Sequence, residues 1–160
     1  MNERKSKIKC KELLKLMAIE ETKEENWSNF GQVKKQISSI PNAGFGVFAS
    51  VDFEDNDIIT EYIGKKITNE KVLELTYGNQ FHYIAQLDSK TCIDGKRTVN
   101  NKTKLGSMIN DIRIQTKTNC ALFRIKSKLY IIATKKIKTN EEFFLNYGKK
   151  YWDYYEIAAR

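Results

Sequence analysis

Two glycines flank an aromatic residue immediately before an apolar run, at Gly44, Phe45 and Gly46. Glycine permits positive φ values and lets a ligand approach the main chain closely, so backbone N–H and C=O groups there can bind a polar small molecule. The segment lacks the third glycine and the following helix of a dinucleotide-binding motif. Taken alone, it is more typical of a hairpin turn before a strand than of a binding loop.

The residue types that most hydrolases and metalloenzymes need are scarce. His82 is the only histidine, so a Ser-His-Asp triad could be built on no other residue, and a histidine-rich metal site is excluded. Cys10, Cys92 and Cys120 are odd in number and far apart, which argues against a disulfide framework and against a CxxC-type zinc cluster. We therefore expect reduced thiols, no bound metal and chemistry that needs little acid–base machinery.

A succession of further motifs follows the glycine pair along the chain. They are Glu61-Tyr62-Ile63-Gly64, residues 81–88, Cys92-Ile93-Asp94, residues 106–111, Thr118-Asn119-Cys120 and residues 140–148. This succession resembles the SET domain of protein lysine methyltransferases, whose pattern is GxG, EYxG, YxFxLD, a VDA-type strand, RFINHSC, PNC and GEELTYDYG. The resemblance covers roughly residues 36–152 and preserves both the order and the spacing of the motifs.

The resemblance implies a fold and an activity. The fold is mainly β, a β-rich α+β arrangement of small twisted sheets with few short helices, in which the carboxy-terminal segment forms a pseudoknot that brings Asn110 next to Tyr147. The activity is methyl transfer from S-adenosylmethionine to a protein lysine, most plausibly in a histone tail. Such an in-line displacement needs a neutral amine and close alignment rather than acid–base groups.

The resemblance also assigns roles to matching residues. Tyr147 would be the catalytic tyrosine, and Tyr62, Leu145 and Tyr147 would wall a narrow channel in which a desolvated lysine has a lowered pKa. The implied cofactor-binding residues are Gly44, Phe45, Gly46, Tyr83, Ser107, Asn110, Asp111 and Trp152. Asn110 would bind the cofactor's amino group and Trp152 would stack on its adenine, while Phe81 is an alternative register for Tyr83. As isolated residues, Tyr62 and Tyr147 would more commonly be half-buried strand residues.

Three positions depart from the family pattern. Asp111 stands where the family has His, Ser107 replaces an Arg, and Leu145 occupies a Phe or Tyr position. The Asp111 carboxylate would favour the sulfonium of the cofactor if it lay close to it. Leu145 offers no hydroxyl to hold a water, which favours di- or trimethylation. These departures leave open a SET-like module that binds chromatin or a protein partner without turnover.

Short strands must position these residues. Runs rich in Ile, Val, Phe and Tyr predict strands over residues 36–40, 46–49, 57–62, 81–87, 121–126 and 129–134. Thr68 as N-cap and Gly78 as C′ residue predict a helix over residues 69–77. Ser6 begins a predicted amphipathic helix that ends near Met17. We divide the chain into a basic, helical extension, residues 1–35, and a SET-like catalytic domain, residues 36–160, which includes the aromatic carboxy-terminal segment.

Charge narrows the choice of partners. The net charge of +8 and pI of about 9.3 favour a polyanion, an acidic protein or a membrane surface as partner. Residues 112–140 hold eight Lys or Arg and no acid, and strand alternation would place Arg124, Lys126 and Lys128 on a solvated face and Leu122 with the core. This basic face would meet nucleosomal DNA, or it is an ordinary lysine-rich surface.

A basic domain does not by itself attract a basic histone tail. Acidic residues would therefore have to line the peptide groove, and the candidates are Asp52, Glu54, Asp55, Asp57 and Asp88. No apolar run reaches the roughly 20 residues that span a bilayer, so we expect an intracellular protein without membrane contact. The resemblance implies that it acts on chromatin in the nucleus. A non-histone lysine substrate and a simple nucleic-acid-binding domain are the alternatives.

Overall fold

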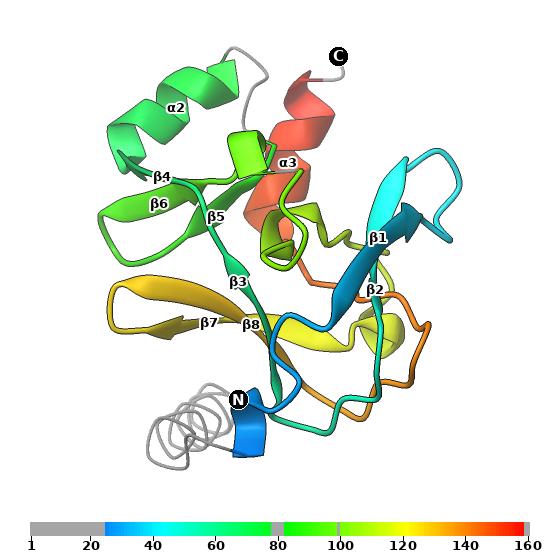
Figure 1. The fold of residues 1–160 in the computed structure, drawn as a ribbon. Coiled ribbons are helices and arrows are strands. Elements are labelled where there is room, and N and C mark those ends of the chain that lie inside the picture. Colours follow the sequence, from blue (N-terminus) through cyan, green and yellow to red (C-terminus); the bar gives the residue numbers. More distant parts are fainter. Residues whose placement is uncertain (1–24, 78–81, 99, 159–160) are drawn as a thin grey trace, which may run out of the picture.

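The computed structural model describes residues 25–77, 82–98 and 100–158. Short strands dominate these residues and form three small sheets joined by short helices (Figure 1). The strands are β1 (Val33–Ile37), β2 (Phe45–Ala49), β3 (Ile58–Tyr62), β4 (Lys65–Thr68), β5 (Ile84–Gln86), β6 (Thr91–Asp94), β7 (Cys120–Ile125) and β8 (Lys128–Ala133). The α-helices are α2 (Asn69–Tyr77) and α3 (Lys149–Ala158), and the 3-10 turns are η1 (Glu25–Trp27), η2 (Lys96–Thr98), η3 (Gly106–Met108) and η4 (Gln115–Lys117).

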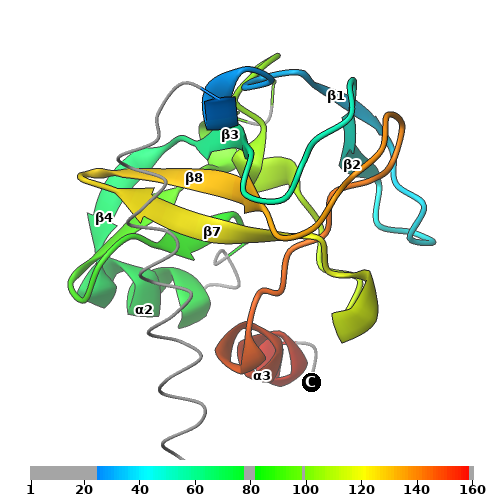
Figure 2. The same cartoon turned by 90° about the horizontal axis from the view of Figure 1, so that it is seen from below.

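All strand pairings within the three sheets are antiparallel. β1 and β2 form a hairpin, β8 lies between β3 and β7, and β6 lies between β4 and β5. The register places Tyr62 opposite Leu129 and Glu61 opposite Tyr130. Figure 2 shows α2 and α3 on the same side of the β7 and β8 ribbons. This arrangement confirms the predicted fold of small sheets with few helices.

The main hydrophobic core lies between the sheets. Phe53 and Phe143 are fully buried, and their ring centroids lie 5.6 Å apart in an edge-to-face arrangement. Other fully buried large side chains of this core are Val47, Ile59, Leu105, Ile109, Ile131 and Ile137. Burial of each such side chain contributes roughly 1.5–3 kcal/mol. This core holds β2, β3 and β8 in place beneath the segments that carry the predicted site.

A second, smaller cluster packs on the opposite face of β3 and β8. Successive strand residues point to opposite faces, so Tyr130 faces away from the side on which Ile131 is buried. The Trp27 ring meets the Tyr130 ring edge to face at 5.1 Å, and the Phe30 ring lies 5.2 Å from that of Trp27. Because Trp27 and Phe30 pack here and β1 begins at Val33, the folded domain starts before residue 36.

Local sequence signals identified most of the elements. All six predicted strands overlap observed strands, and the helix spans residues 69–77 as predicted. The backbone N–H of Lys71 donates to Thr68 Oγ1 at 3.3 Å, which confirms Thr68 as the N-cap. The predicted stop at Gly78 and the predicted helix from Ser6 lie outside the described residues. Among the described residues, no helix is long and apolar enough to cross a membrane.

Strand and helix signals did not predict β4, β6 or α3, and a strand at β6 was implied only by the resemblance of Cys92-Ile93-Asp94 to the family's VDA-type strand. β4 begins with two exposed lysines, and β6 has only four residues, so neither shows a clear alternating pattern. α3 contains four aromatic residues, which favour strands by propensity. Its start is nevertheless marked locally, because the Asn146 side chain accepts the N–H of Gly148 at 2.8 Å and Gly148 has φ 84°.

The prediction for Leu122 is wrong. Arg124, Lys126 and Lys128 are exposed as expected, but Leu122 is also 38% exposed and does not join the core. Its side chain lines a cavity instead. Leu122 shares its face of β7 with Arg124, two residues further on, so alternation in this strand places it away from Ala121, Phe123 and Ile125, which pack against the second cluster.

Two distant segments of the chain cross next to that cavity. Asn110 and Phe144 form an isolated parallel bridge, and the backbone N–H of Leu145 donates to the Asn110 carbonyl at 2.9 Å. The carboxy-terminal segment therefore runs beside residues 109–111 before it enters α3 (Figure 1). This contact is the approach of Asn110 to the Tyr147 segment that the resemblance implied.

Candidate active site

A cavity of about 580 Å³ opens between β5, η3, the carboxy-terminal segment and α3. Its volume falls within the range of roughly 300–1,000 Å³ typical of small-molecule sites. The lining residues are Ile40, Pro41, Asn42, Ala43, Tyr62, His82, Tyr83, Ile84, Ala85, Ser107, Ile109, Asn110, Asp111, Leu122, Leu145, Tyr147, Tyr151, Trp152 and Tyr155. Residues expected to bind the cofactor and residues expected to form the lysine channel thus share one cavity.

Two tyrosine hydroxyls in this cavity are fixed by backbone carbonyls. The Tyr62 hydroxyl donates to the carbonyl of Tyr83, and the Tyr147 hydroxyl donates to the carbonyl of Ile109, each at 2.6 Å. Tyr83 has φ 67°, an uncommon conformation for a residue with a side chain. The structure therefore brings Tyr62, Leu145 and Tyr147 together, as the resemblance implied.

Burial keeps both hydroxyls protonated. It raises the pKa of Tyr62 and of Tyr147 well above the ordinary value, because a tyrosinate would lose its hydration there. Burial likewise raises the pKa of Tyr151 to about 12. At neutral pH these phenols are therefore hydrogen-bond donors and carry no negative charge.

Asn110 joins the glycine loop to the carboxy-terminal segment. Its Nδ2 donates to the Phe45 carbonyl at 3.0 Å and lies 3.5 Å from Glu142 Oε1. Because Nδ2 faces these two acceptors, Oδ1 is left to accept a hydrogen bond from a ligand in the cavity. This placement fits the implied role of Asn110 toward an amino group.

A buried carboxylate explains the second glycine of the loop. Glu142 accepts hydrogen bonds from Ser38 Oγ at 2.6 Å, from Ser39 Oγ at 2.6 Å and from Ser39 N at 2.8 Å. A Cβ at Gly46 would overlap Glu142 Oε1 and lie 2.9 Å from its Cδ. Glycine at this position is therefore required by the packed carboxylate, whether or not a ligand is bound. Sequence reasoning missed Glu142 because nothing local shows that it is buried.

The glycine motif itself stands apart from the cavity. Gly44, Phe45 and Gly46 are not among the lining residues, whereas their neighbours Asn42 and Ala43 are. Gly44 has φ 73°, a conformation that glycine adopts without strain. The half-exposed Phe45 ring lies 5.1 Å from Lys35 Nζ on β1. The motif contacts the cavity lining through the Phe45 carbonyl, which accepts a hydrogen bond from Asn110 Nδ2.

Asp111 binds three N–H groups from different parts of the chain. Its Oδ1 accepts the backbone N–H of Arg113 at 2.7 Å, and its Oδ2 accepts the backbone N–H of Tyr147 and the indole N–H of Trp152, both at 2.9 Å. The carboxylate in place of the family's histidine is thus an acceptor that ties a loop to α3. Asp111 is also the only carboxylate among the residues that line the cavity.

The Trp152 indole is already covered on one face. The Arg113 guanidinium lies 4.2 Å from the centre of the Trp152 ring, a distance typical of a cation–π contact. The Tyr147 and Trp152 rings are nearly parallel, with centroids 6.0 Å apart. An adenine that stacks on the Arg113 side of Trp152 would therefore have to displace the guanidinium.

Tyr83 and Ser107 complete the set assigned from the resemblance. Tyr83 lines the cavity and is 38% exposed. Ser107 is buried, lines the cavity and has its Oγ 3.2 Å from Thr98 Oγ1. Phe81, the alternative to Tyr83, lies outside the described residues.

Three ring-bearing residues of the cavity, His82, Tyr151 and Tyr155, were missed by the sequence reasoning. His82 Nδ1 lies 3.1 Å from the Tyr151 hydroxyl, and the His82 ring also lies edge to face with that of Tyr155. A signal was present, because Tyr147, Tyr151 and Tyr155 recur every four residues, the spacing of one helix face. These residues give the cavity an aromatic wall.

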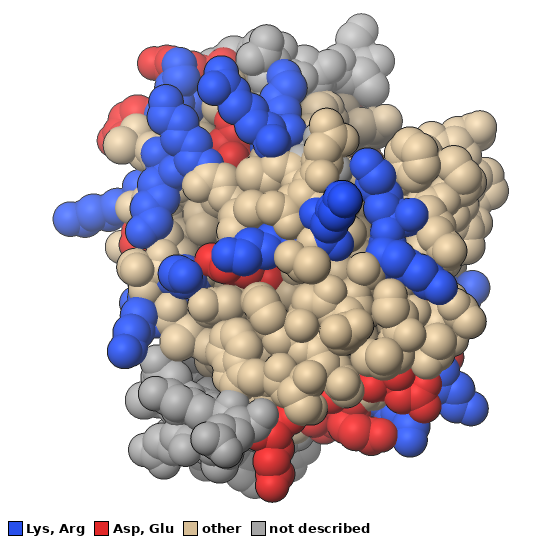
Figure 3. All heavy atoms as spheres, viewed as in Figure 1, with Lys and Arg blue, Asp and Glu red and all other residues tan. Residues whose placement is uncertain are grey.

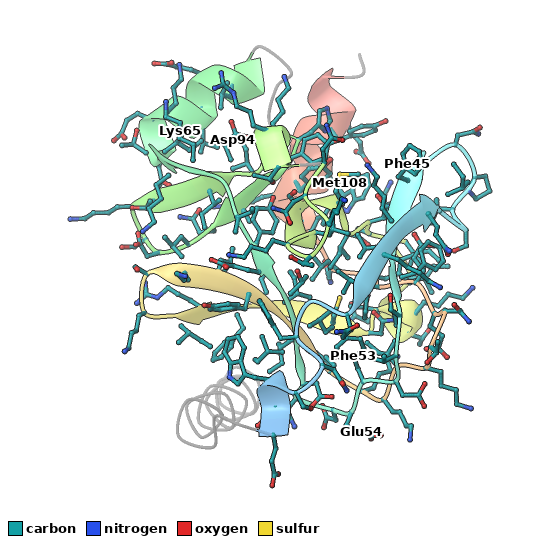
Figure 4. All side chains as sticks on the ribbon, viewed as in Figure 1. Phe45, Phe53, Glu54, Lys65, Asp94 and Met108 are labelled. Atoms are coloured by element: carbon teal, nitrogen blue, oxygen red, sulfur yellow. The ribbon has the colours of Figure 1, made fainter. Side chains whose placement is uncertain are left out.

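The acidic residues expected beside the site do not line the cavity. Asp52 accepts two hydrogen bonds from Thr139, and Glu54 pairs with Lys136 at 3.0 Å. Figure 4 shows Glu54 at the opposite end of the molecule from Phe45 and Met108. Asp88, after β5, lies 3.9 Å from Arg124 and is likewise absent from the lining. These carboxylates therefore do not form the wall of the cavity itself.

The described residues show no arrangement for a metal ion. Within them, no three or more His, Cys, Asp or Glu side chains come together as a ligand cluster. Cys92 and Cys120 are free and buried. Burial raises the pKa of both thiols, so neither is a ready nucleophile.

Similarity to known proteins agrees with this architecture of small sheets around a tyrosine-lined cavity. The family model for the SET domain matches residues 44–148. The chain therefore belongs to the SET domain family.

Its relatives and structural neighbours are larger proteins. N-lysine methyltransferase KMT5A of Xenopus tropicalis is 30% identical over 127 residues, which cover 72% of this chain and 36% of that protein. A histone-lysine N-methyltransferase of Emericella nidulans, H3 lysine-4 specific, is 27% identical over 139 residues, or 78% of this chain and 11% of that protein. This chain thus corresponds to about a third or less of the length of these two relatives.

A solved structure shares the fold. The Polycomb Repressive Complex 2 of Chaetomium thermophilum, in an autoinhibited conformation bound to S-adenosylmethionine, aligns with a TM-score of 0.60 and 22% sequence identity. The alignment covers 79% of this chain and 16% of that chain. At this identity the likeness supports the three-dimensional arrangement.

Proposed function

We propose that this domain transfers a methyl group from S-adenosylmethionine to the side-chain amine of a lysine in a protein substrate. The observation that carries the proposal is the pair formed by the buried Tyr62 and the half-buried Tyr147, whose hydroxyls bind backbone carbonyls within one cavity. Membership of the SET domain family and the activities named for its relatives support the same conclusion.

The cavity offers suitable groups for the cofactor. When bound, S-adenosylmethionine supplies an electrophilic methyl group on a sulfonium. Asn110 would accept a hydrogen bond from its amino group through Oδ1, and the Asp111 carboxylate adds a negative charge on the same wall. Trp152 would stack on the adenine after Arg113 moves. The remaining members of the proposed set are Gly44, Phe45, Gly46, Tyr83 and Ser107.

The rest of the cavity would receive the lysine. Tyr62, Leu145 and Tyr147 present aromatic and aliphatic surface that desolvates an amine and so favours its neutral, nucleophilic form. The protonated hydroxyls of the two tyrosines, fixed at 2.6 Å from carbonyl oxygens, hold the channel walls in a defined orientation. Such alignment is the main contribution a protein makes to an in-line displacement.

We further propose a histone lysine as the substrate, with action on chromatin in the nucleus. Two of the relatives described above are named as N-lysine or histone-lysine methyltransferases. In Figure 3, lysines and arginines gather over α2 and β4, and acidic residues gather at the opposite end. Exposed Arg124, Lys126 and Lys128 offer a further basic surface for nucleosomal DNA. A DNA contact of this kind predicts binding that weakens steeply with salt.

A methyl-transfer assay tests the proposed activity. The domain is incubated with radiolabelled S-adenosylmethionine and nucleosomes, free histones or a total protein lysate. Tyr147→Phe removes the hydroxyl in the cavity, and Tyr130→Phe removes a hydroxyl from the second cluster as the matched control. We expect lysine labelling that the first variant loses and the second retains, with mass spectrometry showing two or three methyl groups because Leu145 adds no polar group to the channel.

The outcomes separate the candidate functions. Labelling confined to non-histone proteins would retain the enzyme and change its substrate. Cofactor binding by calorimetry without any labelling would leave a SET-like binding module. Absence of both would contradict the site assignments and favour the nucleic-acid-binding alternative if DNA still binds.

A further inference from the structure

Three consecutive residues hold the carboxy-terminal segment at three points. The Ile109 carbonyl accepts the Tyr147 hydroxyl, the Asn110 carbonyl accepts the Leu145 N–H, and the Asp111 carboxylate accepts the Tyr147 N–H. Tyr147 is thus held at two points: Asp111 binds its backbone N–H, and the Ile109 carbonyl binds its hydroxyl. Of these three acceptors, only that of Asp111 depends on the identity of a side chain.

The Asp111 carboxylate also connects Tyr147 to α3. Its Oδ2 receives both the Tyr147 N–H and the Trp152 indole N–H at 2.9 Å, and its Oδ1 receives the Arg113 N–H at 2.7 Å. The Arg113 guanidinium in turn covers the Trp152 ring, and its Nη2 lies 3.8 Å from Glu156 Oε1. One side chain therefore fixes the loop, the tyrosine and the helix relative to one another.

No amide or imidazole can make the same three contacts. An ionised carboxylate has two acceptor oxygens with about four lone-pair sites, so it can accept three donors at once. An asparagine has one acceptor oxygen, and its NH₂ group would face either the Arg113 N–H or the N–H groups of Tyr147 and Trp152, which are donors themselves. A neutral imidazole has a single acceptor nitrogen. The residue that departs from the family pattern is therefore the residue type that this local geometry requires.

We propose that Asp111 is the positioning residue for Tyr147 and that it sets the hydroxyl's place in the cavity by binding the Tyr147 N–H and the Trp152 indole together. The inference rests on the proposed function, because Tyr147 is taken as the catalytic tyrosine. Asp111 acts here through hydrogen bonds to the protein itself, which differs from a direct contact with the cofactor.

Asp111→Asn tests the proposal, with Glu74→Gln as a carboxylate-to-amide control, because the exposed Glu74 pairs with Lys71 on α2 and does not line the cavity. A displacement of about 1 Å at a reacting group can cost about 10²-fold in rate. We expect Asp111→Asn to lower kcat on free histones by about tenfold or more and to leave KM within about threefold, since the channel walls of Tyr62 and Leu145 remain. Glu74→Gln should leave both constants unchanged.

A spectroscopic measurement tests the link without activity. The chain has two tryptophans, so in a Trp27→Phe background the emission reports Trp152 alone. Loss of the carboxylate from the indole N–H should shift this emission in Asp111→Asn but not in Glu74→Gln. Thermal unfolding confirms that each variant is folded. If Asp111→Asn does not fold, Asp111→Glu takes its place, because it retains the charge but moves the carboxylate by one carbon–carbon bond.

The two proposals fail in different ways. If the wild-type domain labels no protein, the proposed function fails, and an unchanged Trp152 emission in the variant would then also overturn the link. If the wild type is active and folded Asp111→Asn keeps kcat within about twofold, the positioning role is overturned. A rise in KM alone, with kcat retained, would assign Asp111 to ligand binding instead.

Discussion

Replacing Gly46 by alanine should destabilise the domain far more than replacing Gly44, although both glycines belong to one three-residue motif. A Cβ at position 46 would overlap Glu142 Oε1, whose carboxylate is buried and held by two serines. At position 44 the backbone has φ 73°, but no atom lies within 4 Å of the added carbon. The first change therefore displaces a buried charge, and the second only strains the backbone.

The hydrogen bonds give the expected magnitudes. Moving the Glu142 carboxylate away from position 46 breaks at least two of its three bonds to Ser38 and Ser39. Hydrogen bonds to charged groups contribute about 1.5–3 kcal/mol each, so Gly46→Ala should lower the free energy of unfolding by about 3–6 kcal/mol. A non-glycine residue in the left-handed region costs about 1–2 kcal/mol, which is the loss expected for Gly44→Ala.

Equilibrium unfolding in urea, followed by circular dichroism, measures both losses. A double-mutant cycle adds the decisive comparison, because Glu142→Ala removes the two nearest atoms that the new Cβ would meet and leaves only the Asn110 Nδ2 contact at 3.3 Å among the three nearest. In that background Gly46→Ala should cost no more than about 1 kcal/mol, the usual size of a small backbone or surface effect. A loss for Gly46→Ala that is no larger than that for Gly44→Ala, or that persists undiminished without the Glu142 carboxylate, would refute the reasoning.

Other regions of the fold make equally direct predictions. Trp27→Ala should lower the free energy of unfolding by about 2–3 kcal/mol through loss of its contacts with Tyr130, below the full cost for a completely buried Trp because Trp27 is only half-buried; urea unfolding checks this, and an unchanged midpoint would contradict the second cluster. Cys120, whose pKa burial raises strongly, should resist thiol reagents in the native protein and react in denaturant, as mass spectrometry of labelled peptides can show; fast native labelling would mean that it is exposed. Burial raises the pKa of Tyr151 from 10.0 to about 12, so the neutral phenol's contribution to stability is complete below pH 10 and is lost as pH rises toward 12. Tyr151→Phe should flatten that part of the stability profile, and an unchanged alkaline slope would exclude Tyr151 as its cause.

The parts that sequence predicted correctly depend on local signals. The helix over residues 69–77 is marked by an N-cap at Thr68 that acts within three residues, and the apolar runs of β3 and β8 need only strand propensity. The glycine at position 44 needs only its own φ value. The order of the motifs then indicated a family and, through it, the meeting of Asn110 with the carboxy-terminal segment.

The parts that could not be predicted depend on distant partners. Asp111 gains its role from Tyr147 and Trp152, which are far along the chain, and Glu142 gains its role from Ser38 and Ser39. Leu122 lies on the same face of β7 as the exposed Arg124, as a period of two requires, but the cavity that it lines is formed with distant segments and could not be predicted from the strand alone. The resemblance therefore proposed several residues that line the cavity, but not the hydrogen bonds that hold them in place.

The crossing of residue 110 by residues 144–145 fixes the order in which the site can appear during synthesis. The ribosome adds roughly 5–20 residues per second, so Tyr62 and Asn110 are synthesised several seconds before Leu145. Over that interval the segment that packs against Asn110 does not yet exist. During that wait, neither the Tyr147 hydroxyl nor α3 is present to close the lining, and a ligand has no complete surface to bind. A nascent chain stopped before Leu145 would hold most of the lining residues and no cavity.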